Sequence, residues 1–173
     1  MTYKILTPTE WESLRYNLNP FYQMISDAYL HTGFQPTEFR EFVQNPHWYL
    51  HGWHRIKLHG GREIFLSIEG TIVMDVFVDA VKAGNPMHRD RASFRDALLR
   101  SAVGADMELE GINPSMFRNT IMAWLAACFP EKMAQVISSL GCTVETLREV
   151  RKECVFGRED LEKMRFHLKG WGE

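Results

Sequence analysis

The sequence predicts a mainly helical domain that carries a small antiparallel β-hairpin or sheet. Most of the chain repeats apolar residues at the spacing of an amphipathic helix, and these segments begin and end with helix-capping residues. One stretch, residues 47–67, is instead rich in aromatic and β-branched residues around a Gly-Gly pair, which is typical of a hairpin. A length of 173 residues fits a single domain.

Composition and charge are those of an ordinary globular protein. Apolar residues make up 45% of the chain and charged residues 24%, which argues against disorder. No apolar run approaches the ~20 residues of a membrane-spanning helix, and no secretion signal is visible, so we expect a cytoplasmic protein without a membrane partner. The formal net charge is −2, whereas domains that bind duplex DNA tightly usually carry a positive excess. The three cysteines form no Cys-x-x-Cys pair and are expected to be reduced, buried thiols: Cys128, Cys142 and Cys154.

Three helices are predicted before the hairpin. The segment Thr7–Glu10 reads as a capping box with proline at the first helical position, and it opens a helix through about Asn17. Pro20 opens a second helix that ends at Gly33, and Pro36 precedes a third over Thr37–Val43. The second helix shows a buried face made of Phe21, Met24, Ile25, Ala28 and Tyr29.

The hairpin and two helices follow. His47–Leu58 and Arg62–Ser67 are the predicted strands, joined by a turn at His59-Gly60-Gly61. Glu69–Val81 is expected to be helical, and after a break at Gly84-Asn85-Pro86 Ser93 caps a helix through Val103. The first of these helices is indicated by the spacing of Ile72, Val73, Val76, Phe77 and Ala80.

Helices also fill the C-terminal part. Asn113 is the expected cap of a helix with Pro114 at its first position, and Pro130 starts another that ends at Gly141. Thr143 caps a third, and Glu159–Leu168 is a last short helix before Gly170-Trp171-Gly172. We therefore expect residues 1–173 to form a single domain, with a short C-terminal tail from about residue 157.

Several of these segments share motifs with one known family. The chain has Thr32–Phe39 (TGFQPTEF), Pro114–Thr120 (PSMFRNT) and Leu140–Cys142 (LGC), in that order. They resemble the boxes of the tyrosine recombinase (phage integrase) catalytic domain, which read Thr-Gly-x-Arg-x-x-Glu-Leu, Pro-His-x-x-Arg-His-Thr and Leu-Gly-His. Leu6–Trp11 and Gly60–Ser67 are similar to the family's first helix entry and second hairpin strand. The resemblance covers most of residues 6–152 and implies the same fold.

The same resemblance implies that the catalytic groups have been replaced. In the family, a tyrosine attacks a DNA phosphodiester, arginines and histidines stabilise the charge that develops, and a hairpin lysine protonates the leaving oxygen. Every tyrosine of this chain lies at or before Tyr49, so none matches the nucleophile. The resemblance therefore implies an inactive member that is not an enzyme. The positions that match catalytic residues are Gln35, Lys57 (or Arg62), Ser115, Arg118, Cys142, and Arg151 with its neighbours Val150 and Lys152.

Two interpretations of the matching positions stay open. Gln35 and Ser115 can still donate hydrogen bonds and Arg118 keeps its bidentate fork, so the pocket could hold a phosphate without cutting it. Alternatively, Gln35 and Ser115 arose by neutral substitution and have no binding role, and Arg118 makes a structural salt bridge, for example with Glu38. Lys57 and Arg62 fit either a phosphate contact or a solvated strand.

Other clusters give weaker indications. Basic residues of the C-terminal quarter fit DNA backbone, a partner or plain surface: Arg148, Arg151, Lys152, Arg158, Arg165 and Lys169. The run 88–91 with Arg95 and Arg100 is read as a solvated face. His47, His51 and His54 lie in strand or loop, where their offsets do not converge, so no metal and no cofactor are expected.

The resemblance implies an inactive recombinase-like protein of a mobile genetic element that binds duplex DNA weakly or modulates DNA recombination. The alternative is an interaction module without DNA binding. It would dock on a recombinase, another partner or a second copy through the C-terminal helix, with Phe156, Leu161, Phe166 and Trp171. An enzyme of altered chemistry is the third reading, but no nucleophile-and-base pair supports it.

Overall fold

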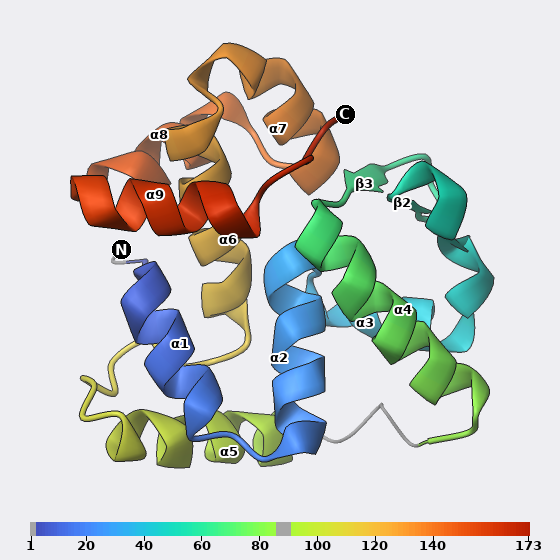
Figure 1. Ribbon diagram of the computed structural model, residues 1–173, viewed down its shortest axis with the longest axis horizontal. Coiled ribbons are helices and arrows are strands. Elements are labelled where there is room, and N and C mark those ends of the chain that lie inside the picture. Colours follow the sequence, from blue (N-terminus) through green and yellow to red (C-terminus); the bar gives the residue numbers. More distant parts are fainter. Residues whose placement is uncertain (1–2, 86–90) are drawn as a thin grey trace.

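The computed structural model describes residues 3–85 and 91–173 (Figure 1). They form a mainly helical structure with one three-stranded antiparallel sheet, as the sequence predicts. No helix within these ranges is both long and apolar enough to cross a lipid bilayer.

The first three helices form where the sequence predicts them: α1 (Pro8–Tyr16), α2 (Pro20–Thr32) and α3 (Pro36–Gln44). The predicted capping box is confirmed, because Glu10 N–H donates to Thr7 Oγ1 (3.1 Å) and Thr7 N–H donates to Glu10 Oε1 (3.0 Å). Gly33 ends α2 with φ 67°, a left-handed conformation that glycine adopts without strain.

The hairpin prediction is right about the turn and wrong about the first strand. The sheet contains β1 (Tyr49–Leu50), β2 (Arg55–Lys57) and β3 (Glu63–Phe65), and each strand pairs with the next. The predicted single strand His47–Leu58 is broken by the 3₁₀ turns η1 (Pro46–Trp48) and η2 (His51–Trp53). After η2, His54 takes φ 52°, which no extended strand allows.

The next two helices are α4 (Ile68–Lys82) and α5 (Arg91–Gly104). Ser93 was expected to cap α5, but it lies inside the helix, which has already begun at Arg91. Part of the predicted break before it, at Pro86, falls outside the described residues. On α4, Phe77 is buried as its spacing suggests, yet Ile72 and Val76 face solvent.

Four α-helices complete the chain: α6 (Ser115–Cys128), α7 (Met133–Leu140), α8 (Val144–Lys152) and α9 (Arg158–His167). The helix α6 begins at Ser115, one residue later than expected, so both Asn113 and Pro114 precede it. Pro130 opens the 3₁₀ turn η3 (Pro130–Lys132) instead of α7. The predicted ends at Gly141 (φ 63°) and Thr143, which accepts from Thr146 N–H, are confirmed.

The central helix is α6, which packs against α2, α8 and α9 (Figure 1). Its buried Trp124 donates through Nε1 to the Leu6 carbonyl (2.9 Å), and Leu6 N–H donates to Thr120 Oγ1 (3.0 Å). The last helix, α9, lies against α1 and α6, and beyond it Trp171 is buried between the rings of Phe65 and Phe129. The end of the chain is therefore part of the hydrophobic core.

Candidate functional site

Four segments that are distant in sequence meet around Arg118, on the first turns of α6. Arg118 Nη1 donates to the carbonyl of Gly33 (2.9 Å), where α2 ends. Its electrostatic neighbours are Arg62 of the hairpin, Glu38 of α3 and Cys142, which follows α7. We refer to Gly33, Glu38, Arg62, Arg118 and Cys142 as the Arg118 cluster.

Within this cluster, Glu38 binds Arg62 and not Arg118. Arg62 makes a bidentate pair with Glu38, Nε to Oε2 at 2.9 Å and Nη2 to Oε1 at 2.7 Å, and its Nη1 donates to the Ser139 carbonyl. The salt bridge between Arg118 and Glu38 that one interpretation expected is therefore wrong. Arg62 holds the hairpin against α3 and α7, and its three terminal donors are committed to protein acceptors.

Arg118 has hydrogen-bonding capacity left. Among the described residues, neither its Nε nor its Nη2 contacts an acceptor, and no carboxylate forms an ion pair with it. Burial lowers the pKa of Arg118 and the charge of Arg62 lowers it further, while Glu38 and Cys142 act in the opposite direction. An arginine stays protonated despite such a shift, so the cluster contains one partly buried cation without a carboxylate partner.

Cys142 is a neutral neighbour of this cation. Burial raises the pKa of its thiol, and the nearby charges of Arg118 and Arg62 offset only part of that effect. Burial likewise raises the pKa of Cys128, to about 11, and that of Cys154. These three thiols are protonated at neutral pH, which is the unreactive form of cysteine.

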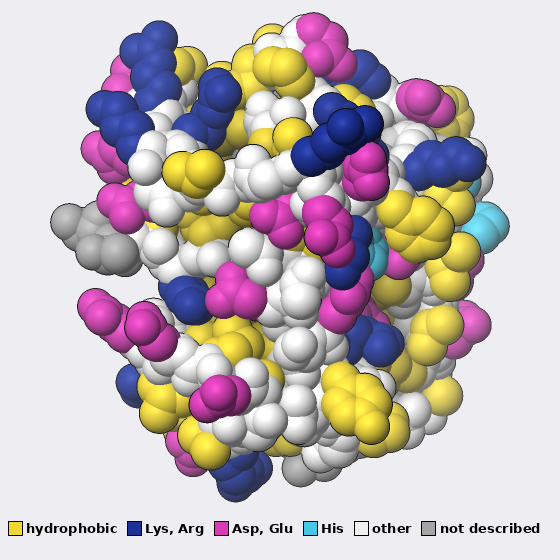
Figure 2. Space-filling model, turned by 60° about the vertical axis from the view of Figure 1, so that its left-hand side comes forward, with side chains coloured by type: hydrophobic (Ala, Val, Ile, Leu, Met, Phe, Trp, Pro, Cys, Tyr) yellow, Lys and Arg dark blue, Asp and Glu magenta, His cyan; other side chains and the backbone are white. Residues whose placement is uncertain are grey.

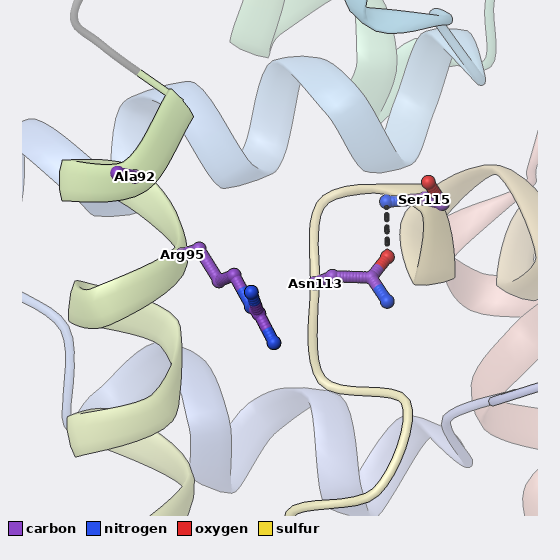
Figure 3. Close-up of a pocket in the computed structure, with 4 residues that line it drawn as sticks. All are labelled: Ala92, Arg95, Asn113 and Ser115. Carbon is purple, nitrogen blue, oxygen red and sulfur yellow. Dashed lines mark hydrogen bonds between the residues drawn. The ribbon is translucent and has the colours of Figure 1, made fainter.

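Ser115 lies one turn before Arg118 and faces a separate open pocket of about 470 Å³. Figure 3 shows Arg95 reaching from α5 toward Asn113 and Ser115, with the hydrogen bond from Ser115 N–H to Asn113 Oδ1 (2.9 Å) dashed. The positive end of the α6 dipole favours an anion here. However, the N–H groups of Met116 and Phe117 already donate to backbone carbonyls, so the donors left for a ligand are side chains.

The remaining predicted site residues are exposed, and Gln35 is the one that bonds to a member of the Arg118 cluster. Gln35 precedes α3, and its N–H donates to Glu38 Oε1 (2.8 Å). Lys57 pairs in register with Glu63 on the hairpin. Arg148, Arg151 and Lys152 lie on the second half of α8, so Arg151 is about 11 Å along the helix axis from the start of α8 near Cys142.

The basic surface is interrupted. Figure 2 shows Lys and Arg side chains gathered at the upper left of one face of the molecule, with Asp and Glu side chains among them. No continuous basic band crosses this face, so any contact with DNA there involves few phosphates.

The five tyrosines have surroundings of three kinds. Tyr49 donates to Asp75 Oδ1 (2.6 Å), Tyr3 donates to Glu149 (3.0 Å), and Tyr16 is 85% exposed. Tyr22 and Tyr29 are buried in a stack of aromatic rings. Within the ranges that the structure describes, no tyrosine hydroxyl bonds to Arg118.

The three histidines near the hairpin do not converge. His51 Nδ1 lies 2.7 Å from Asp75 Oδ1, His54 Nδ1 lies 3.0 Å from Thr71 Oγ1, and the His47 ring packs against Trp48. In residues 3–85 and 91–173, no three His, Cys, Asp or Glu side chains are grouped so that they could hold a metal ion.

The C-terminal helix exposes only part of its apolar surface. Phe166 is 74% exposed, but Trp171 is 3% exposed, and Phe156 and Leu161 are half-buried. A docking surface on α9 therefore reduces to Phe166 and the side chains around it.

Sequence reasoning did not identify Arg95 as a neighbour of Ser115. Arg95 belongs to a run that the sequence indicates as solvated, and only the packing of α5 near the start of α6 brings it to the pocket. No local pattern in the chain carries that information.

Comparisons with protein-family models, with curated proteins and with solved structures find no match to this chain.

Proposed function

We propose that this protein is a catalytically inactive tyrosine-recombinase-like domain that binds duplex DNA weakly through the phosphate backbone. One observation carries the proposal: the segments whose motifs resemble the family's catalytic boxes converge in space. Gly33, Arg62, Arg118 and Cys142 come from four such segments and form one cluster. A chance motif match predicts no such convergence.

The chemistry of the cluster supports binding without cleavage. Family chemistry needs several charged donors aimed at the reacting phosphate, and each lost donor costs roughly 10²- to 10³-fold in rate. Here Arg118 keeps donors for a phosphate, while Arg62 is neutralised by Glu38 and Cys142 is an uncharged thiol. A phosphate held by one guanidinium would not be activated for attack.

The open pocket provides a second contact of the same kind. Ser115 lies one helical turn before Arg118, and Arg95 of α5 lines the same pocket as Ser115, so a second cation lies near the start of α6. A net charge of −2 opposes DNA binding at long range, and the proposed contact therefore involves about two or three phosphates. We propose that such a protein modulates recombination in the cytoplasm of a cell carrying a mobile genetic element.

The second candidate function is an interaction module that docks on a recombinase or a second copy through α9, without DNA. The 74% exposure of Phe166 favours it, and the burial of Trp171 leaves it a smaller surface. Failure to bind DNA at low salt would make this the preferred function.

The test is fluorescence anisotropy with a labelled random duplex of about 30 base pairs, from about 25 to about 200 mM salt. The logarithm of the association constant should fall with the logarithm of salt concentration with a slope of about −2 to −3. Arg118→Gln and Arg95→Gln should each make that slope less steep by about 1.

Arg158→Gln is the matched control, because Arg158 is solvent-exposed on α9 and, among the described residues, its ion pair is with Glu162 on the next turn. It should leave the slope unchanged. Thermal melts of the Arg118 variant check that losing the bond to Gly33 has not unfolded the chain. Equal slopes for all three variants, or no binding at about 25 mM salt, would refute the proposal.

A further inference from the structure

Three aliphatic side chains form an exposed row on α4. Ile68, Ile72 and Val76 are four residues apart, so they lie on one face of the helix, and they are 52%, 61% and 57% exposed. Single exposed aliphatic residues are ordinary in soluble proteins. A row of three beside an apolar hollow is the feature that marks interaction surfaces.

The row borders a groove of about 530 Å³ between α2 and α4, which lie side by side in Figure 1. The groove walls are apolar side chains of both helices: Pro20, Phe21, Met24, Ile72, Val73 and Val76. Its lining runs from Pro20 to Asp27 on α2 and from Ile72 to Val76 on α4, so the groove is roughly 10 Å long. About two turns of a third helix match that length, and a helix packs naturally between two others.

The charges around the groove are acidic. Arg15 lines one end, but its guanidinium is paired bidentately with Asp27 at 2.8 and 2.9 Å, so it offers no free positive charge. Asp75 and Asp79 follow Ile72 and Val76 by three residues and therefore edge the exposed row. Asp79 is exposed, whereas Asp75 also accepts from Tyr49 and lies 2.7 Å from His51 Nδ1. The only nearby cation on α4, Lys82, lies at the end of that helix.

We propose that the α2–α4 groove binds an amphipathic helix of a partner protein, whose apolar stripe is flanked by Lys or Arg side chains. The apolar row requires the stripe, and the edge formed by Asp75 and Asp79 selects the basic flanks. Two copies of this chain joined face to face would bring these aspartates against their own equivalents, which disfavours self-association. The same aspartates repel DNA phosphates, so this groove is separate from the proposed DNA contact and does not depend on it.

Two synthetic peptides of about 18 residues test the proposal with the full chain. Both carry the same leucine stripe at helical spacing, one with lysine flanks and the other with glutamate flanks. In anisotropy titrations the lysine peptide should bind at least about tenfold more tightly. Ile72→Asp should weaken its binding by about tenfold or more, and Asp79→Lys should reverse the preference between the two peptides.

Val103→Asp is the matched control, because Val103 is 64% exposed on α5, away from the groove. It introduces the same carboxylate at equal exposure and should leave binding unchanged. Circular dichroism melts establish that the variants are folded, and Asp79→Lys tests the charge argument without touching an apolar residue.

Equal affinity for the two peptides would refute the proposal, as would equal losses in the Ile72 and Val103 variants. Sedimentation equilibrium of the free chain tests whether the groove instead binds a second copy of the protein. A dimer that Ile72→Asp dissociates would assign the groove to a second copy and overturn the assignment to a basic partner helix.

Discussion

Glu69 is the carboxylate that joins three helices, and replacing it with glutamine should remove a pH-dependent part of the stability. From α4, its Oε2 accepts from His31 of α2 (Nε2 at 3.2 Å) and from His167 of α9 (Nδ1 at 2.6 Å). Burial alone would raise the pKa of Glu69, but the hydrogen bonds from the two histidines outweigh it and hold the pKa at about 2.

The size of the effect follows from that shift. A fall in the pKa of Glu69 from 4.5 to about 2 is roughly 2.5 units, or about 3.4 kcal/mol at 1.36 kcal/mol per unit. The Glu69 side chain is 34% exposed, so screening by water reduces the expected contribution to about 1–2 kcal/mol. Because the pKa is lower in the folded state, this stability is present above pH ~4.5 and is lost as pH falls toward ~2.

Urea unfolding of the wild type and of Glu69→Gln, followed by far-ultraviolet circular dichroism at several pH values, measures it. At pH 7 the variant should be less stable by about 1–2 kcal/mol, and the difference should shrink as pH falls through ~4 toward ~2. Glu162→Gln is the control, because its carboxylate is exposed and should contribute under about 0.5 kcal/mol. A difference between Glu69→Gln and the wild type that stays constant across pH would refute the reasoning.

Two further outcomes concern packing. Trp171→Ala should destabilise the protein by about 3–5 kcal/mol in urea unfolding, because Trp171 is 3% exposed, whereas Phe166→Ala should change stability by under about 0.5 kcal/mol. Similar effects of the two would contradict the burial of the chain end. Gly33→Ala should cost about 1–3 kcal/mol in the same assay, since φ is +67° and the added Cβ would lie 2.8 Å from Leu140 Cδ2. It should also weaken DNA retention, because the Gly33 carbonyl anchors Arg118; unchanged stability would show that this turn carries no strain.

Helix ends are the part of the fold that the sequence predicts best, because they depend on neighbours along the chain. The Thr7–Glu10 capping box, the ends at Gly33 and Gly141 and the cap at Thr143 are all confirmed. Ser93 is an instructive failure. Serine is a favourable N-cap residue, but Arg91 and Ala92 before it are good helix formers, so the helix starts earlier and Ser93 lies inside it.

The buried face of a helix is harder to predict, because it depends on partners that are distant in sequence. The helix α4 carries apolar residues on two faces: Met74, Phe77 and Val78 are buried, while Ile72 and Val76 are exposed. Helical periodicity detects both sets and cannot choose between them. The prediction of the first hairpin strand is wrong for a related reason. The alternation of side chains along the sequence does not indicate that the backbone turns at His54.

The candidate site shows the same limit. The motif resemblance aligns Gln35, Arg118 and Cys142 with catalytic positions. In the structure Cys142 is an electrostatic neighbour of Arg118, and Gln35 N–H donates to Glu38 of the same cluster. The resemblance does not predict which arginine reaches Glu38, because that depends on where the hairpin docks. Arg62 takes that carboxylate at 2.7 Å and leaves Arg118 without one.

The position of α9 has a consequence for the order in which the molecule is made. The helix closes over α1 and α6, and Trp171 fills a gap between the hairpin and the segment after α6. A growing chain on the ribosome cannot complete this wall until Trp171 has been synthesised and has left the exit tunnel. Until then the part of α6 that α9 covers stays open to water and to other nascent chains, so a chaperone could bind there.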